Sequence, residues 1–152
     1  MAKLQVGDTA PDFTLQDNQG HTIHLADYQG KNSVVLIFYP GDQTPGCTKQ
    51  LCSARDDNSL YEKAGAVVFG VNPGSEASHT KFVEKHNLTT PLLVDKDLHV
   101  ASLYDAVMGV GPLKIVNRTV VTINKDGKIV FYKRGMPVTY EILSTVNTEI
   151  KA

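Results

Sequence analysis

The chain lacks several features that would place it in other classes of protein. Fifteen Lys and Arg residues against sixteen Asp and Glu residues give a formal net charge of −1. With no run of like charge, this excludes the electrostatic footprint of a nucleic-acid binder. No apolar run approaches the roughly 18 residues of a membrane span, and the first residues lack the apolar core of a secretory signal. We therefore expect a soluble, cytoplasmic protein with neither a nucleic-acid nor a membrane partner.

Cysteine is also scarce, because the 152 residues include only Cys47 and Cys52. Two cysteines are too few for the disulfide framework of a small secreted protein. A close pair in a reducing compartment is more often catalytic or metal-binding than structural. The length is that of one ordinary domain, residues 1–152, which can bury a core without disulfides. A single domain and a monomer are the default expectations.

Signals for a bound cofactor are missing as well. No Gly-x-Gly-x-x-Gly or P-loop string follows a predicted strand, so nothing indicates a nucleotide. His79 and His86 could be combined with the cysteines as a metal site, but the cysteine spacing is not that of a zinc pair. Two histidines two turns apart on a polar helix are usually solvated. We expect no cofactor and no metal.

The stretch from Ser33 to Arg55 organises the rest of the chain. Its first seven residues, 33–39, are almost all apolar and rich in β-branched side chains, which is typical of a strand buried on both faces. Pro40 and Gly41 end this strand. Thr44 can cap a helix and Pro45 suits a first helical position. The pattern therefore predicts a strand, a short polar loop and a helix.

Cys47 is expected in the first turn of that helix. Unpaired backbone N–H groups and the positive end of the helix dipole favour a thiolate there, which makes Cys47 a candidate nucleophile. The alternative is a buried structural thiol, since free cysteine is among the most buried residue types. Thr44 could point its hydroxyl at the sulfur or its substrate, or could cap the Cys47 amide instead.

These residues carry a family resemblance. The string Pro40-x-x-x-Thr44-x-x-Cys47 resembles the active-site signature of the peroxiredoxins. The longer match through Cys52 and Arg55, with Gly70-Val71-Asn72-Pro73, Pro91 to Asp95 and Asn117-Arg118-Thr119 further on, resembles the bacterioferritin-comigratory or peroxiredoxin Q branch. Nearly the whole chain is covered by this resemblance.

Hydrophobic periodicity and turn residues predict an α/β fold. The expected strands cover 13–16, 22–25, 33–39, 66–71, 92–94, 116–123 and 128–132, and the expected helices cover 44–63, 75–86, 98–104 and 138–149. An N-terminal β-hairpin, a βαβ unit with parallel pairing and a later antiparallel hairpin give a mixed central sheet with helices on both faces. This pattern fits the thioredoxin-like fold, which the resemblance also implies; spacing alone leaves other α/β sandwiches open.

The resemblance implies a role for each site residue. Cys47 would attack the peroxide, and Cys52 would resolve the resulting sulfenic acid as an intramolecular disulfide. Arg118 would hold the thiolate and polarise the peroxide, while Thr44 would donate a hydrogen bond and Pro40 would shield the sulfur. The alternatives are a packed core thiol for Cys52 and an outward-facing strand residue for Arg118. Arg55 could simply brace the helix through an acidic neighbour.

The sequence therefore indicates a thiol peroxidase that reduces hydrogen peroxide and alkyl hydroperoxides and is recycled by thioredoxin or a similar dithiol. One rival is a thioredoxin-like disulfide reductase, although threonine stands at Thr44 where its first cysteine would be. Another is a redox-switched binding protein in which the cysteine pair only reports oxidant.

Overall fold

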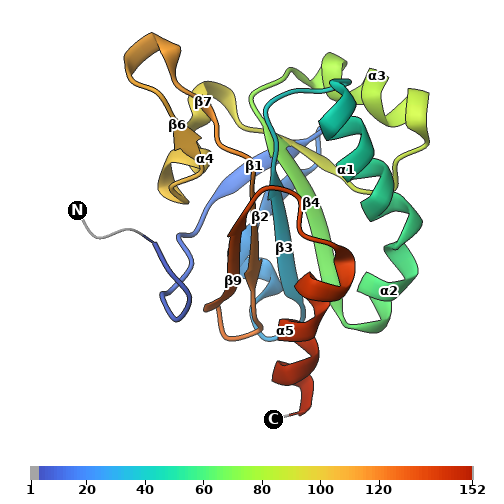
Figure 1. The fold of residues 1–152 in the computed structure, drawn as a ribbon, viewed down its shortest axis with the longest axis vertical. Helices are drawn as coiled ribbons and strands as arrows, with labels where there is room; N and C mark the ends of the chain where they lie inside the picture. The colour runs from blue at the N-terminus through green and yellow to red at the C-terminus, as the bar shows by residue number, and fades with distance from the viewer. Residues whose placement is uncertain (1–3, 152) are drawn as a thin grey trace.

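The computed structural model describes residues 4–151, with side chains described as far as residue 146. Its centre is a seven-stranded sheet with strand order β2-β1-β5-β4-β3-β8-β9 (Figure 1). The strands are β1 (Thr14–Asp17), β2 (Thr22–His24), β3 (Ser33–Phe38), β4 (Ala66–Asn72), β5 (Leu92–Val94), β8 (Thr119–Ile123) and β9 (Ile129–Arg134). A second, two-stranded sheet pairs β6 (Val107–Met108) with β7 (Ile115–Val116).

The helices are α1 (Pro45–Asp56), α2 (Asn58–Lys63), α3 (Glu76–His86), α4 (His99–Leu103) and α5 (Thr139–Lys151). Short 3₁₀ turns cover η1 (Leu25–Tyr28), η2 (Lys96–Leu98) and η3 (Gly111–Leu113). Within the described residues, no helix combines the length and the hydrophobicity that crossing a membrane requires.

The β3 strand is the centre of the sheet. It pairs in parallel with β4 on one side and antiparallel with β8 on the other, which confirms the βαβ unit and the mixed sheet. The N-terminal hairpin is confirmed by the pairing of β1 with β2. Because every residue of β3 is buried, its alternating side chains supply a hydrophobic core on each face of the sheet.

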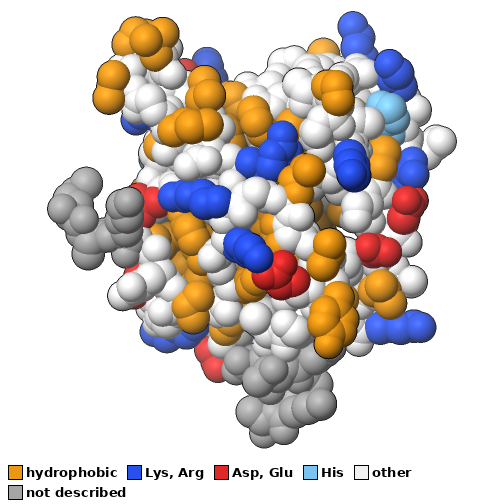
Figure 2. Space-filling view, in the orientation of Figure 1, with side chains coloured by type: hydrophobic (Ala, Val, Ile, Leu, Met, Phe, Trp, Pro, Cys, Tyr) orange, Lys and Arg blue, Asp and Glu red, His pale blue; other side chains and the backbone are white. Residues whose placement is uncertain are grey.

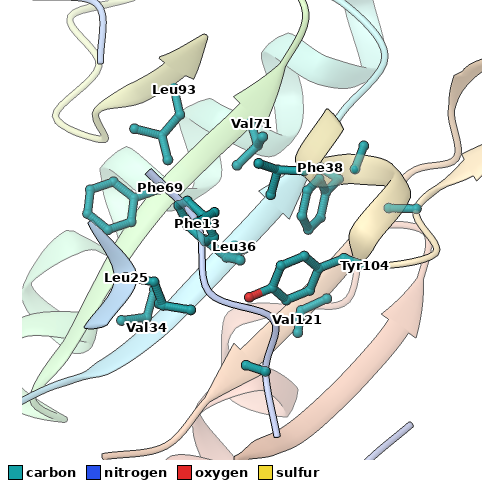
Figure 3. Packing of buried hydrophobic residues seen from close by; sticks show 14 of the residues in the cluster. Phe13, Leu25, Val34, Leu36, Phe38, Phe69, Val71, Leu93, Tyr104 and Val121 are labelled. Carbon is teal, nitrogen blue, oxygen red and sulfur yellow. The ribbon is translucent and has the colours of Figure 1, made fainter. Parts of the chain in front are cut away.

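The first core lies between the sheet and the N-terminal segment with α4. It contains Val34, Leu36 and Phe38 from β3, together with Phe13 and Tyr104, as Figure 3 shows. The rings of Phe38 and Tyr104 lie 5.6 Å apart between their centroids. This core contains no cysteine.

The second core lies between the sheet and helices α1, α2, α3 and α5. It is built on Val35, Ile37 and Tyr39, and it includes Cys47 and Leu51 from α1. The sulfur of Cys47 therefore belongs to a hydrophobic core, and α1 is held to the sheet by apolar packing on one side.

The helix expected over 44–63 is wrong as a single helix, because it breaks at Asp57 into α1 and α2. Asp57 has φ −97° and ψ 12°, outside the helical region. Its carboxylate accepts a hydrogen bond from the hydroxyl of Thr139, at the start of α5. A partner 82 residues away along the chain thus lies at a break that local periodicity does not indicate.

The strand expected over 116–123 is also interrupted. Asn117 and Arg118 form a link between β7, in the small sheet, and β8, in the large one. The amide of Asn117 donates to the carbonyl of Ala106 at 2.8 Å, and the amide of Gly135 donates to the carbonyl of Arg118 at 2.9 Å. The small sheet was not expected from the sequence. It projects from the body (Figure 1) and carries an exposed hydrophobic tip (Figure 2) that includes Val110 and Leu113.

Candidate active site

The end of β3 delivers Cys47 to the first turn of α1, as the sequence predicts. Thr44 is the N-cap residue of α1, with extended backbone angles, and Pro45 opens the helix. Cys47 is fully buried in the second core, so its sulfur is separated from bulk water. A thiolate in this position depends on nearby donors and on the helix N-terminus for its stabilisation.

Thr44 takes the second of the two orientations left open by the sequence. Its Oγ1 accepts a hydrogen bond from the Cys47 amide at 3.4 Å, and its hydroxyl donates to the carbonyl of Gly41 at 3.3 Å. Both distances lie beyond the usual range for such bonds, which marks them as weak. The Thr44 hydroxyl and the Cys47 amide are therefore joined by a weak bond, which a stronger hydrogen-bond partner can replace.

Arg118 is the residue that contacts the sulfur. Its Nη2 donates to the Cys47 Sγ at 3.2 Å, and its Nη1 donates to the Oε1 of Gln50 at 2.7 Å. A Cβ on Gly46 would lie 3.3 Å from Nη2. The absence of a side chain at Gly46 therefore gives the guanidinium the space that it occupies. Arg118 is thus not an outward-facing strand residue, although 71 residues separate it from Cys47.

Gln50 belongs to this site but was not found from the sequence. It is buried on α1 and fixes the orientation of the Arg118 fork through a charge-assisted hydrogen bond. A usable signal was present, because residues three apart on a helix lie on the same face. Gln50 is three residues after Cys47, so the two side chains share the face that meets Arg118.

Cys52 lies in the middle of α1, partly buried and packed against the second core. Cys47 and Cys52 are both free thiols. Pro40 is exposed directly after Tyr39, and its shielding role stays a prediction. Arg55 braces the helix as suggested, because it binds the carboxylate of Asp56 and donates to the carbonyl of His86 at the end of α3.

His79 is not solvated, contrary to the expectation for this helix. Its side chain is 0 % exposed, and its Nδ1 lies 2.6 Å from a carboxylate oxygen of Asp42. The surface of α3 reads as polar, and the buried partner is 37 residues away in the loop before α1. Among the described residues, no three His, Cys, Asp or Glu side chains are grouped as metal ligands would be.

Comparisons with known proteins agree with the geometry. Residues 6–132 match the model of the AhpC/TSA family. Peroxiredoxin Bcp of Bacillus subtilis is 37% identical to this chain over 155 residues, covering 95% of this chain and 94% of the relative. A putative peroxiredoxin bcp of Coxiella burnetii is 41% identical over 130 residues, covering 83% of this chain and 85% of the relative.

Solved structures give the same answer for the fold. The structure of peroxidoxin BcpB from Mycobacterium tuberculosis superposes with a TM-score of 0.88 at 29% identity and covers 95% of this chain and 97% of that one. A cysteine-to-serine mutant of PrxQ from Xylella fastidiosa also gives 0.88, at 25% identity, and covers 99% of both chains. The fold is therefore the thioredoxin-like fold of the peroxiredoxins. A buried cysteine at a helix N-terminus, an arginine on its sulfur and these matches lead to one conclusion: the chain belongs to the AhpC/TSA family and is a peroxiredoxin, a thiol peroxidase.

Proposed function

We propose that Cys47 is the residue that attacks the peroxide and that Cys52 resolves the product within the same chain. The observation that carries this proposal is the 3.2 Å contact between the Arg118 guanidinium and the Cys47 sulfur at the start of α1. A guanidinium on a buried sulfur favours the thiolate, which is the nucleophilic form.

In the first step, the Cys47 thiolate attacks one oxygen of the O–O bond. A sulfur–oxygen bond forms, the O–O bond breaks, and the departing oxygen takes a proton to leave as water or an alcohol. Sulfur is oxidised by two electrons and the peroxide is reduced by two. The remaining N–H groups of Arg118 can stabilise the departing oxygen. Thr44 and the Cys47 amide can join them by giving up their weak mutual bond.

In the second step, the Cys52 thiol attacks the Cys47 sulfenic acid, which releases water and forms a disulfide. Both cysteines lie on the continuous helix α1. Residues five apart on such a helix have Cα atoms roughly 8–9 Å apart, whereas a disulfide tolerates no more than about 7 Å. The first turns of α1 therefore have to unwind before the bond can form.

A dithiol such as thioredoxin would then restore both thiols through a mixed disulfide. Hydrogen peroxide and alkyl hydroperoxides are the proposed substrates. A hollow beside Gln50 is lined in part by Ile37, Val120 and Ile142, and this apolar surface supports the inclusion of organic hydroperoxides.

The test is turnover of hydrogen peroxide and of a bulky hydroperoxide with thioredoxin, thioredoxin reductase and NADPH. We expect repeated turnover at micromolar peroxide. Consumption of a single equivalent, with no recycling by thioredoxin, would show that another reductant serves the chain. Slow consumption of peroxide even in the first turnover would favour a disulfide reductase or a redox-switched binding protein.

A further inference from the structure

A buried ionic network lies at the loop between β3 and α1, and the chemistry of Cys47 does not use it. Its centre is Asp42, whose side chain is 4% exposed. The carboxylate accepts hydrogen bonds from the hydroxyl of Tyr39 at 2.7 Å and from the hydroxyl of Ser78 at 2.6 Å, and Nδ1 of His79 lies 2.6 Å away. A carboxylate with three such close partners is firmly fixed in place.

The ring of His79 is held at both of its nitrogens. The second ring nitrogen of His79, Nε2, lies 3.0 Å from the carbonyl oxygen of Leu93, a group that can only accept. Each ring nitrogen of His79 therefore faces an oxygen of another residue, and the ring is held from both sides. Burial raises the pKa of Asp42, but the hydrogen bonds from His79, Ser78 and Tyr39 outweigh it and lower that pKa. Asp42 is therefore a carboxylate held by three close partners, one of which is the buried ring of His79.

The partners of Asp42 all belong to parts of the fold outside α1. Tyr39 directly follows β3, Ser78 and His79 lie on α3, and Asn72 at the end of β4 adds a longer contact of 3.4 Å. The network thus fixes the loop to the sheet and to α3. None of these partners lies on α1.

The anchored loop is also the one that positions the first turn of α1. Asp42 is two residues before Thr44, which caps the Cys47 amide at 3.4 Å and whose carbonyl accepts from the amide of Thr48 at 2.8 Å. Because these local bonds are few, the position of Thr44 depends strongly on where Asp42 is held. A fixed Thr44 favours the wound first turn, and a released Thr44 favours the unwound one.

We propose that Asp42 and His79 are positioning residues that restrain the unwinding of α1 and so set the rate at which the Cys47 sulfenic acid reaches Cys52. The inference rests on the proposed role of Cys52 as the resolving residue. The contact between Asp42 and His79 keeps the site in the wound form that reduces peroxide, and it slows the condensation that releases water and forms the disulfide. Weakening the pair therefore speeds the second step without speeding the first.

The test is a single-turnover experiment on the full chain with the variant His79→Asn. Since the chain contains no tryptophan, the reaction is followed by rapid quenching and mass spectrometry, which count thiol, sulfenic acid trapped by a dimedone-type probe, and disulfide. We expect disulfide formation to become about tenfold faster, in keeping with the loss of one hydrogen bond to a charged group, while the peroxide step does not become faster. General damage to the fold would slow both steps.

Ser78→Ala serves as the second variant if His79→Asn does not fold. It removes one neutral donor to Asp42, and we expect a gain of about two- to fivefold in the rate of disulfide formation. His24→Asn is the matched control, because His24 pairs with Asp12 at 2.9 Å on the partly exposed N-terminal hairpin and leaves the loop before α1 untouched. Its rate of disulfide formation should equal that of the wild type.

The outcomes separate the inference from the proposed function. If the wild type forms no intramolecular disulfide, the role of Cys52 is wrong. If the wild type forms that disulfide but folded His79→Asn and Ser78→Ala form it no faster, the restraint by Asp42 and His79 is wrong and the proposed function stands.

Discussion

Cys47 and Cys52 are five residues apart on α1, yet they differ in burial, in nearby charge and in position along the helix. Cys47 is fully buried in the first turn, with the Arg118 guanidinium at 3.2 Å from its sulfur. Cys52 is partly buried in the middle of the helix against apolar side chains. The same chemical group thus has a guanidinium and a helix N-terminus beside it at one position and apolar side chains at the other, and we infer different reactivities from these surroundings.

Removing the sulfur of Cys47 tests whether Cys47 is the more reactive of the two cysteines. We expect Cys47→Ser to reduce peroxide no faster than the uncatalysed background, because Cys52 lacks the arginine and the helix N-terminus. The measurement is peroxide consumption by the reduced protein. Substantial residual turnover by this variant would mean that the two sulfurs are chemically equivalent.

Removing the sulfur of Cys52 should leave the first step intact. We expect Cys52→Ser to consume about one equivalent of peroxide at the wild-type rate and then to stop as a sulfenic acid. A dimedone-type probe followed by mass spectrometry detects that species. Recycling of this variant by thioredoxin at the wild-type rate would assign the resolving step to another group.

Replacing Arg118 by lysine tests whether the Cys47 site needs the shape of the guanidinium or only its positive charge. We expect Arg118→Lys to slow the peroxide step by roughly ten- to a hundredfold. An ammonium keeps the charge but cannot bind both Gln50 and the sulfur with a planar fork. The control is Arg134→Lys, on the exposed end of β9, which should keep the wild-type second-order rate constant. Equal second-order rate constants for Arg118→Lys and Arg134→Lys would show that Arg118 has no specific role in the peroxide step.

Amide exchange sharpens the comparison between the helix and the strand that precedes it. In the oxidised protein, we expect the amides of residues 47–55 to exchange at least severalfold faster than in the reduced protein, because the disulfide requires an unwound first turn. Residues 34–38 of β3, paired on both sides, should change little. Unaltered exchange over 47–55, in a sample whose mass shows the intramolecular disulfide, would contradict the unwinding.

The smallest expected effect is on the pH dependence of stability, and it compares two buried carboxylates, Asp42 and Asp95. The pKa of Asp42 is lowered in the fold, because its hydrogen bonds outweigh its burial. The corresponding stability is present above the usual value of 3.8 and is lost as pH falls through the lower folded-state value. We therefore expect the gap in urea midpoint between the wild type and Asp42→Asn to be largest near neutral pH and to shrink in acid.

Asp95→Asn provides the opposite case. Burial raises the pKa of Asp95 despite the hydrogen bonds that it accepts from the amides of Val100 and Ala101. Because the folded-state pKa lies above the usual value of 3.8, the folded protein loses stability as pH rises through that value. The gap in urea midpoint between the wild type and Asp95→Asn should therefore shrink toward neutral pH. Two gaps with the same pH trend would contradict the assignment of these directions.

The sequence predicted those features whose cause is local. The strand, the cap and the helix start around Cys47 follow from adjacent residues, and the hairpins follow from their turns. The break at Asp57 and the burial of His79 could not be predicted, since the partners of these residues, Thr139 and Asp42, are far away along the chain. A charged or polar side chain is predicted to be exposed unless a buried partner for it is known.

Arg118 shows both sides of this limit. The family pattern predicted its place in the site, but periodicity placed it inside a continuous strand. The strand is interrupted there because residues 115–116 pair with β6, a two-residue strand too short to leave a pattern. Gln50 was missed although its spacing of three residues from Cys47 places both on one helix face, because the sequence does not show that this face meets an arginine 68 residues away.

The placement of both cysteines on one helix has a kinetic consequence. Once unwound, a flexible connection of five residues has a root-mean-square length of about 12 Å, and a thiol at that distance behaves as if it were present at millimolar concentration or above. For a resolving thiol so placed, closure of the disulfide is a first-order process. Its rate should be unchanged by dilution of the protein, and a small thiol in solution would have to reach a comparable concentration to intercept the sulfenic acid.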